Sequence, residues 1–155
     1  MIRVATVSDE FDALAGEAGI PGVVTDRVRI IVNAAVEAGE CLVAVASNGE
    51  VEGFVVTTVR SFFARDFVRL LAVSPRHRRS GIGSALLAAA IHRATTDVVF
   101  ISTNESNSAM RALLVRDGWT YSGTLTGIDE GDPEIVFWRE KTTSLEDDDA
   151  SSLTR

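Results

Sequence analysis

The sequence predicts a single α/β (α+β) domain with a mixed, mostly antiparallel β-sheet, a central parallel strand–helix–strand crossover and helices on both faces. Its 155 residues suit one domain with one substantial core. Apolar residues switch along the chain between helical spacing and strand-like runs, and glycine and proline mark short turns between them. A nearly continuous apolar strand precedes a helix and another strand, which is the order of a right-handed parallel crossover.

Two helices are predicted before the first long strands. Residues 2–5 form a candidate N-terminal strand. The Ser-Asp pair at residues 8–9 is typical of a helix N-cap, and the helix that it begins should end at the Gly-Ile-Pro-Gly stretch of residues 19–22. Thr25 caps a second predicted helix, over residues 26–38, whose apolar side chains share one face.

The next segment is predicted to form strands. Residues 41–46 and 51–59 alternate as strands and are joined by the Asn-Gly turn of residues 48–49, which is typical of a β-hairpin. A polar loop over residues 60–65 should lead to the strand over residues 67–73. Because that strand is nearly all apolar, we expect both of its faces to be covered.

Helices and strands alternate in the rest of the chain. The predicted elements are a helix over 81–94, a strand over 98–102, a helix from 106 or 107 to 117, and strands over 119–125 and 135–139. An acidic loop, residues 127–134, separates the last two strands.

Composition excludes several classes of protein. Fifteen basic residues against 22 acidic ones give a formal net charge of −7, and such a chain is a poor general binder of nucleic acid. A single cysteine, Cys41, rules out a disulfide framework and a zinc cluster built on cysteines, and we expect no metal. No apolar run could span a bilayer and no signal-peptide pattern is present, so a cytoplasmic protein without membrane contact is expected. Acidic residues 143–155 should form a disordered tail after a domain of residues 1–142.

A basic cluster stands out in this acidic chain at residues 76–79, directly before a glycine-rich turn. The first turn of a helix exposes unpaired N–H donors and a partial positive charge, so it binds phosphate groups. Gly81 and Gly83 allow the backbone to approach an anion, while Arg78 and Arg79 add charged donors. A pyrophosphate fits this turn. The alternative is a tight turn that only packs the helix on the strand.

Two common phosphate-binding motifs are excluded at this turn. A Walker A loop needs a lysine after its last glycine, but the only lysine of the chain is Lys141. A dinucleotide-binding turn needs a third glycine where Leu86 stands. The ligand must therefore be recognised by another motif.

Residues 71–87 resemble the acetyl-CoA motif of the GCN5-related N-acetyltransferase (GNAT) superfamily. That motif is a strand, then Arg/Gln-x-x-Gly-x-Gly/Ala, then a helix, and Arg78 and the two glycines of the turn occupy its fixed positions. Residues 104–119 resemble the second motif of this superfamily, which is an asparagine, a short helix and then a glycine with an aromatic residue. The resemblance covers roughly residues 42–139 and implies a GNAT-like sheet.

The resemblance implies acetyl-CoA as the cosubstrate and a contact for each part of it. The pantetheine arm would pair, as if it were another strand, with the backbone of Leu71, Ala72 and Val73. Arg78 would guard the pyrophosphate, and Asn107 would contact the CoA arm from the second helix. The amides that would hold the pyrophosphate belong to Arg79, Ser80, Gly81, Ile82, Gly83 and Ser84.

Transfer of an acetyl group to an amine requires a proton acceptor, because an alkylamine with a pKa of about 10.4 must lose a proton to react. In many relatives a tyrosine on the second-motif helix protonates the leaving thiolate, but Leu114 matches that position. In several relatives a glutamate or histidine on the central strand is the base, but Phe67 and Arg69 stand there. Tyr121, the only tyrosine, and Glu134 are the candidates for acid and base. The alternatives are a packed aromatic residue and a solvated turn acid.

Other groups are candidates for roles near the reacting atoms. Asp66 is an outside candidate for the base. Arg69, among apolar neighbours, should either form an internal salt bridge or bind a carboxylate of the substrate. The phenylalanines at residues 62–63 are candidates for a lip on the substrate side. A backbone N–H near residues 72–73 would stabilise the oxyanion.

The predicted function is an acetyl-CoA-dependent N-acetyltransferase that acts on a primary amine of a small molecule by direct attack in a ternary complex. The acidic loop that contains Glu134 favours an amine that is cationic in solution. One alternative is a protein or peptide N-acetyltransferase, and another is a non-catalytic sensor that binds acyl-CoA. The sequence leaves open the acceptor, the length of the acyl donor and whether the protein forms a homodimer.

Overall fold

A computed structural model describes residues 1–9 and 25–142 of the chain, so the helix expected to end at residues 19–22 and the acidic tail lie outside the described residues. Seven strands form one sheet in the order β1-β2-β3-β4-β5-β7-β6. The elements are β1 (Ile2–Val4), α2 (Thr25–Glu37), β2 (Cys41–Val45), β3 (Val51–Phe62), β4 (Arg65–Val73), a 3₁₀ turn (Pro75–His77), α3 (Ile82–Arg93), β5 (Val98–Asn104), α4 (Ser108–Arg116), β6 (Thr120–Leu125) and β7 (Glu134–Glu140). No helix in the described ranges is long and apolar enough to cross a membrane.

The described sheet has the mixed pairing that the sequence predicts. Only β4 and β5 run parallel among the paired strands, and α3 is the crossover between them. The other pairs are antiparallel, including the β2–β3 hairpin at the Asn-Gly turn. In that turn Gly49 adopts a φ of +89°, which a side chain would disfavour, and Asn48 accepts a hydrogen bond from the N–H of Glu50. The predicted fold class is therefore confirmed.

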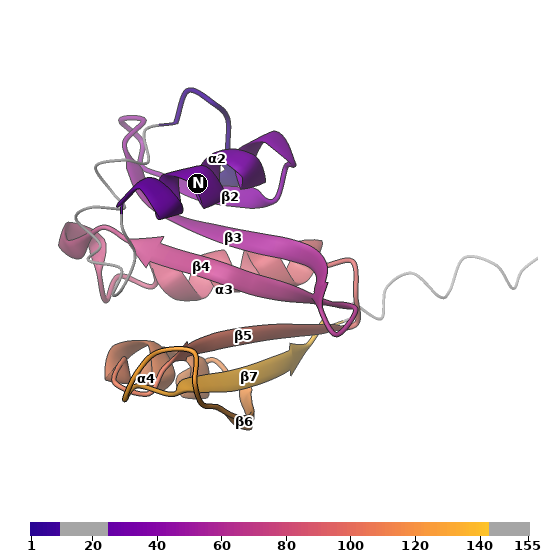
Figure 1. Ribbon diagram of the computed structural model, residues 1–155. Helices are drawn as coiled ribbons and strands as arrows, with labels where there is room; N and C mark the ends of the chain where they lie inside the picture. The colour runs from indigo at the N-terminus through magenta and orange to yellow at the C-terminus, as the bar shows by residue number, and fades with distance from the viewer. Residues whose placement is uncertain (10–24, 143–155) are drawn as a thin grey trace, which may run out of the picture.

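Helices cover both faces of the sheet, as predicted (Figure 1). We call the two faces the α2 face and the α3–α4 face. Val28, Val32 and Ala35 of α2 pack on inward residues of β2 and β3, and Cys41 is fully buried there. Burial raises the pKa of this thiol to about 12, so Cys41 is an inert core residue. The larger core lies on the α3–α4 face, where Leu86 packs in one cluster with buried residues of β2, β3, β4, β5 and β7.

The β3–β4 connection is shorter than the sequence predicts. A polar loop was expected over residues 60–65, but β3 continues to Phe62 and β4 begins at Arg65. Phe63 and Ala64 form the turn with φ values of 49° and 59°. Positive φ at both central residues suits the right-handed twist of a hairpin, but these positions usually hold asparagine or glycine. Because neither residue type is present, the sequence carries no signal for this turn.

Asp66 is a structural residue at the start of β4. Its side chain is 1% exposed and accepts hydrogen bonds from the backbone N–H groups of Arg60 (3.0 Å) and Thr95 (2.6 Å) and from the Thr95 hydroxyl (3.0 Å). Burial alone would raise the pKa of Asp66, but hydrogen bonds from Arg60, Thr95 and Thr96 together outweigh it, so the pKa lies below its usual value. Both carboxylate oxygens hold the crossover connection to the β3–β4 hairpin, which leaves Asp66 no role as the base.

We expect Asp66→Ala to lower the free energy of unfolding by about 2 kcal/mol at neutral pH, because two partly buried N–H donors lose their acceptor. A carboxyl with a lowered pKa stabilises the fold above its unfolded pKa of about 3.9, and this contribution is lost as the pH falls through its folded pKa. Urea unfolding at several pH values should therefore show a difference from wild type that shrinks in acid. The exposed Asp97→Ala variant is the control, and equal stability of Asp66→Ala and Asp97→Ala would contradict the assignment.

Candidate active site

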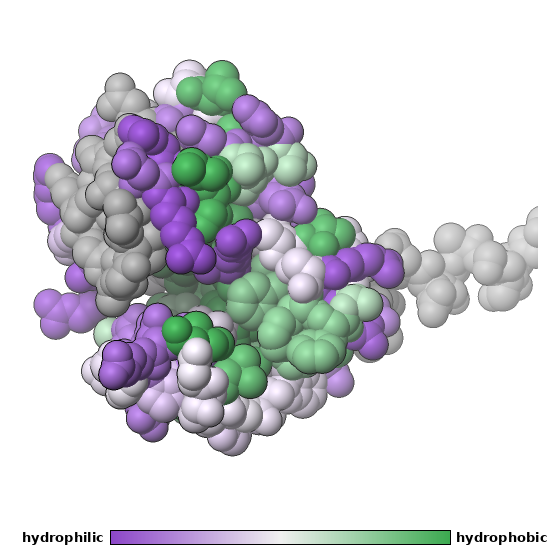
Figure 2. Space-filling view, viewed as in Figure 1, coloured by the Kyte–Doolittle hydropathy of each residue, from purple (hydrophilic) through white to green (hydrophobic). Residues whose placement is uncertain are grey.

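A gap opens between β4 and β5 in the middle of the sheet. The two strands are paired at only three positions, from Asp66↔Val99 to Val68↔Ile101. Beyond Val68, β4 pairs only with β3, while β5 continues along β7. Figure 1 shows the two strands separating, and the space-filling view shows a hollow between the two halves of the molecule (Figure 2). The backbone of residues 69–73 therefore presents one unpaired edge to this gap.

A β-bulge marks the point where the strands part. The β3–β4 register passes from Val56↔Leu70 to Thr57↔Val68 and skips Arg69. An extra residue bends a strand and increases its twist, and here it follows the last residue of β4 that pairs with β5. The bulge therefore accounts for the divergence of β4.

Arg69 is exposed at this bulge. No salt bridge of Arg69 is found within residues 1–9 and 25–142, so the predicted internal salt bridge is not seen there. The open gap also explains why β4 is less covered than its apolar sequence predicts. Phe67, Leu70, Leu71 and Val73 are only half-buried.

The three residues expected to contact pantetheine all lie on the open side of β4. The register pairs Leu71, Ala72 and Val73 with β3 on one side, and no described strand adjoins them on the other. An extended, amide-containing ligand could add here as an extra strand. The arrangement fits the predicted contacts, which stay a prediction.

The loop over residues 78–84, which we call the phosphate loop, connects the 3₁₀ turn after β4 to the first turn of α3. Gly81 is the N-cap of α3 with a φ of +86°, and no side chain caps the helix. The first helical hydrogen bond runs from the N–H of Ala85 to Gly81, which leaves the N–H groups of Ile82, Gly83 and Ser84 without an acceptor among the described residues. These donors and the positive end of the helix suit an anion, and the predicted contacts with a pyrophosphate stay a prediction.

The two glycines of this loop differ in what a side chain there would meet. Gly81 has a positive φ, and a Cβ there would meet nothing within 4 Å, so the loop is open to a ligand. A Cβ at Gly83 would lie 3.1 Å from Cδ1 of Leu113 on α4, so that side chain would have to shift slightly. Arg78 reaches back to β4, where its Nε donates to the carbonyl of Val73 at 3.4 Å. Arg79 adopts a φ of +60°.

Two further predicted residues lie on or near α4. Asn107 is the N-cap of α4, and its Oδ1 accepts a hydrogen bond from the N–H of Met110 at 3.2 Å. Its predicted contact with the CoA arm stays a prediction. Leu114, at the position where relatives hold a tyrosine, is fully buried in the core. It therefore offers no proton to a leaving thiolate.

Glu134 has the environment of a proton acceptor. It is the first residue of β7 and lies opposite Asn104 at the end of β5, beyond the point where β4 and β5 part. Its Oε2 is buried and has no hydrogen-bond partner within residues 1–9 and 25–142. Burial raises the pKa of this carboxyl, a hydrogen bond from the Ser102 hydroxyl lowers it, and the charges of Asp129 and Asp132 raise it further. The net direction is upward, which suits general base catalysis.

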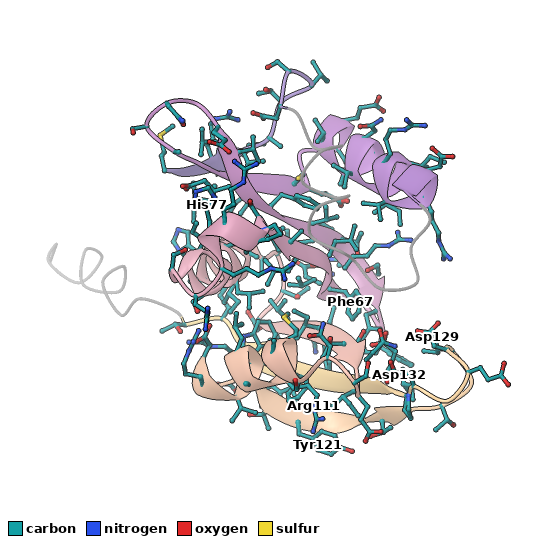
Figure 3. The ribbon with its side chains drawn as sticks, turned by 90° about the vertical axis from the view of Figure 1, so that its left-hand side faces the viewer. Phe67, His77, Arg111, Tyr121, Asp129 and Asp132 are labelled. Atoms are coloured by element: carbon teal, nitrogen blue, oxygen red, sulfur yellow. The ribbon has the colours of Figure 1, made fainter. Side chains whose placement is uncertain are left out.

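The acidic loop before β7 is tied to the end of β5. Asn104 Nδ2 donates to Asp129 Oδ2 at 2.8 Å. Ser106 donates to Asp132 from its N–H at 3.0 Å and from its hydroxyl at 2.6 Å. Figure 3 shows Asp129 and Asp132 on the same side of the molecule as Phe67, whereas His77 lies on the opposite side. The gap therefore has an acidic mouth on one side and the phosphate loop on the other.

Tyr121 lies away from these groups. It belongs to the edge strand β6, with β7 and β5 between it and β4. Its side chain is 59% exposed, and its hydroxyl shares a hydrogen bond of 2.9 Å with Thr124 Oγ1. Its ring contacts Phe137 edge-on, on the α3–α4 face. The structure therefore does not bring the two candidate catalytic residues together.

Sequence reasoning missed the polar partners of Glu134 and of the acidic loop. Ser102 and Asn104 alternate along β5 and so share the α2 face with Glu134, which the register pairs with Asn104. The alternation along β5 was enough to predict that Ser102 and Asn104 share a face. Their contact with Glu134 could not be predicted, because it depends on the order of the strands in the sheet.

Known proteins with a similar sequence or structure are acetyltransferases. A model of the acetyltransferase (GNAT) family matches residues 15–119. A GNAT-family acetyltransferase from Bacillus cereus ATCC 10987 is 31% identical, with 92% of this chain and 98% of that one covered and a TM-score of 0.81. A putative GNAT acetyltransferase from Desulfovibrio desulfuricans is 18% identical (coverage 92% and 99%, TM-score 0.76). A putative acetyltransferase from Salmonella typhimurium, solved with its cofactor acetyl-CoA, is 21% identical (93% and 95%, TM-score 0.72).

A search of curated proteins found no significant match. The fold, the gap and the phosphate loop define an acyl-group transferase. The family match and the Bacillus cereus relative show that this chain belongs to the GNAT acetyltransferase family, and it is an N-acetyltransferase enzyme.

The neighbours of Glu134 should control its titration. Removing the Ser102 hydroxyl takes away a hydrogen bond to the carboxylate, so we expect Ser102→Ala to raise the pKa of Glu134. Asp129→Asn removes a nearby negative charge and should lower it. Carbon-13 NMR titration of the glutamate carboxyls, with Glu134→Gln to assign the signal, measures both shifts. A downward shift in Ser102→Ala would contradict the described environment.

Proposed function

We propose that this enzyme transfers the acetyl group of acetyl-CoA to the primary amine of a small molecule by direct attack in a ternary complex. The observation that carries the proposal is the unpaired edge of β4 between the bulge at Arg69 and the phosphate loop. An extended arm bound there would reach from the N-terminus of α3 to the closed end of the gap. The Salmonella typhimurium neighbour, which shares this fold, was solved with acetyl-CoA.

In this arrangement the thioester lies where β4 and β5 meet. The amine nitrogen attacks the thioester carbon, the carbon–sulfur bond breaks, and CoA leaves as a thiolate that takes a proton from water or a nearby hydroxyl. The oxyanion needs an N–H donor, and the bulge at Arg69 frees backbone groups from the β3–β4 ladder close to this point. We therefore favour this bulge over Ala72 or Val73 as the source of the donor.

Glu134 is the group that we assign as general base. An alkylamine is protonated at neutral pH, so a proton must leave before or during the attack. The buried, unpartnered Oε2 of Glu134 and its raised pKa suit this role. Asp129 and Asp132 lie at the acidic mouth of the gap and would attract a cationic amine. The charges around the mouth thus support an amine acceptor.

An aromatic cluster beside the gap supports an acceptor with an apolar substituent. The ring of Phe62 lies 5.1 Å from that of Phe67 and 5.2 Å from that of Phe100. Phe67 and Phe100 are paired across β4 and β5 just before the strands part, and Ser102 follows on the same face as Phe100. Figure 2 shows hydrophobic residues gathered beside the hollow on this face. An aromatic or branched group of the acceptor could pack there.

A protein or peptide acceptor is the second candidate. Phe63, at the tip of the β3–β4 turn, is 89% exposed and contacts Phe62 edge-on. The exposed ring of Phe63 could hold the side chain of a peptide. The two acceptor classes differ in size, so a substrate panel separates them.

Acceptor-dependent thiol release from acetyl-CoA is the test of the proposal. The panel holds arylalkylamines, polyamines, amino acids, aminoglycosides and short peptides. Gly81→Trp should abolish release and CoA binding by filling the open side of the phosphate loop. Gly49→Trp is the matched control, because Gly49 also has a positive φ and open space but lies in the distant β2–β3 turn.

Tight CoA binding without turnover across the panel would favour a sensor. No CoA binding by the folded wild-type protein would overturn the proposal. Release with peptides alone would select the second candidate.

Glu134→Gln should lower kcat by about a hundredfold, because the amine loses its proton acceptor. Wild-type activity should fall as the pH drops through the raised pKa of Glu134, and this acidic limb should disappear in the variant.

Tyr121→Phe tests the second catalytic candidate, and its exposed place on β6 predicts little change in kcat. Initial rates from acid to alkaline pH measure both effects. A large loss in Tyr121→Phe with full activity in Glu134→Gln would reverse the assignment.

A further inference from the structure

Arg116, the last residue of α4, reaches the first turn of α3. Its Nη2 donates to Ser84 Oγ at 2.6 Å, and its Nε donates to Asp117 Oδ1 at 3.0 Å. Ser84 is the third residue of α3, and its N–H is one of the three left without an acceptor. The guanidinium of Arg116 therefore lies beside the backbone donors of the phosphate loop.

Close packing of the two helices fixes this position. The absence of a Cβ at Gly83 lets Leu113 of α4 approach the first turn of α3. Leu113 and Arg116 are three residues apart and so share one face of α4. The close approach of Leu113 to Gly83 thus lies beside the contact of Arg116 with Ser84.

Only part of the guanidinium of Arg116 is hydrogen-bonded to other described residues. Its side chain is 66% exposed, and Asp117 occupies Nε while Ser84 occupies Nη2. Nη1 has no hydrogen-bond partner in the described ranges. An exposed ion pair contributes little stability, so its arginine can turn to a ligand at low cost. Arg78 and Arg79 are the first two residues of the same loop.

We propose that Arg116 is a phosphate-binding residue of the acetyl-CoA site, an inference that rests on the proposed function. A guanidinium offers paired N–H donors that match the oxygens of a phosphate group. CoA carries such oxygens on its pyrophosphate and on its 3′-phosphate. Asp117 and Ser84 hold the guanidinium at the loop, and a CoA phosphate takes its remaining donors.

A purely structural role would give a different result. As a tie between α4 and α3 alone, Arg116 would affect the thermal midpoint of the protein and leave its affinities for CoA and for dephospho-CoA unchanged. The test therefore compares CoA with dephospho-CoA, which differ only in the 3′-phosphate.

Calorimetric titration of the full chain with both ligands tests the proposal on Arg116→Ala, Arg116→Lys and Arg93→Ala. Arg93, at the other end of α3, is exposed and is the control. Arg116→Ala should weaken CoA binding about tenfold, and Arg116→Lys, which keeps the charge, should weaken it less. Arg93→Ala should bind as wild type does. If Arg116→Ala weakens the binding of CoA and of dephospho-CoA equally, Arg116 binds the pyrophosphate. If it weakens the binding of CoA alone, Arg116 binds the 3′-phosphate.

Wild-type affinities in Arg116→Ala, with or without a lower thermal midpoint, would overturn this inference and leave the proposed function standing. Failure of the wild-type protein to bind CoA would overturn both. Arg116→Lys keeps the charge with a smaller change in packing, so it gives a reading even if Arg116→Ala folds poorly.

Discussion

The divergence of β4 from β5 is the constraint on which the rest of the structure depends. A sheet split along its middle would normally expose an unpaired edge and weaken the domain. Here the strands stay joined at three positions, and the core on the α3–α4 face spans both halves. Leu86 and Leu87 of the crossover helix pack in this core with residues of β3, β4, β5 and β7. The molecule can therefore keep an open gap on one side because the other side holds the halves together.

The two sides of the gap carry opposite charge, although the chain as a whole is acidic. The phosphate loop offers the positive end of α3, Arg78 and Arg79, while the mouth near Glu134 carries three carboxylates. An anionic cosubstrate and a cationic acceptor would be guided to different sides and would meet at the bulge. In the proposed reaction, the separation of charge would direct each reactant to its own side of the gap. It also explains how an acidic protein can bind a ligand that carries several phosphates.

Much of the fold follows from local sequence signals, whereas the catalytic side of the site does not. The Asn-Gly turn, the glycine at the start of α3 and the cap at Asn107 each need only a few neighbouring residues, and the structure places all three where the sequence predicts. The bulge at Arg69 is a matter of register between two strands, and an apolar run does not specify register. For the same reason the burial of Glu134 against Ser102 is invisible until β7 is known to lie between β5 and β6. The turn at Phe63 and Ala64 lacks the residues that usually mark it, so tertiary pairing overrides local preference there.

The single cysteine has a practical consequence. Cys41 is fully buried beneath α2, and its thiol has a pKa of about 12, so almost no thiolate is present at the pH of a typical enzyme assay. Reagents that detect free sulfhydryl groups react with thiolates and need access to them. In the folded protein the only sulfhydryl that they report would be the one released from CoA. The same property makes the native chain a background on which one cysteine, introduced at any exposed position, can carry a spectroscopic label without first removing another.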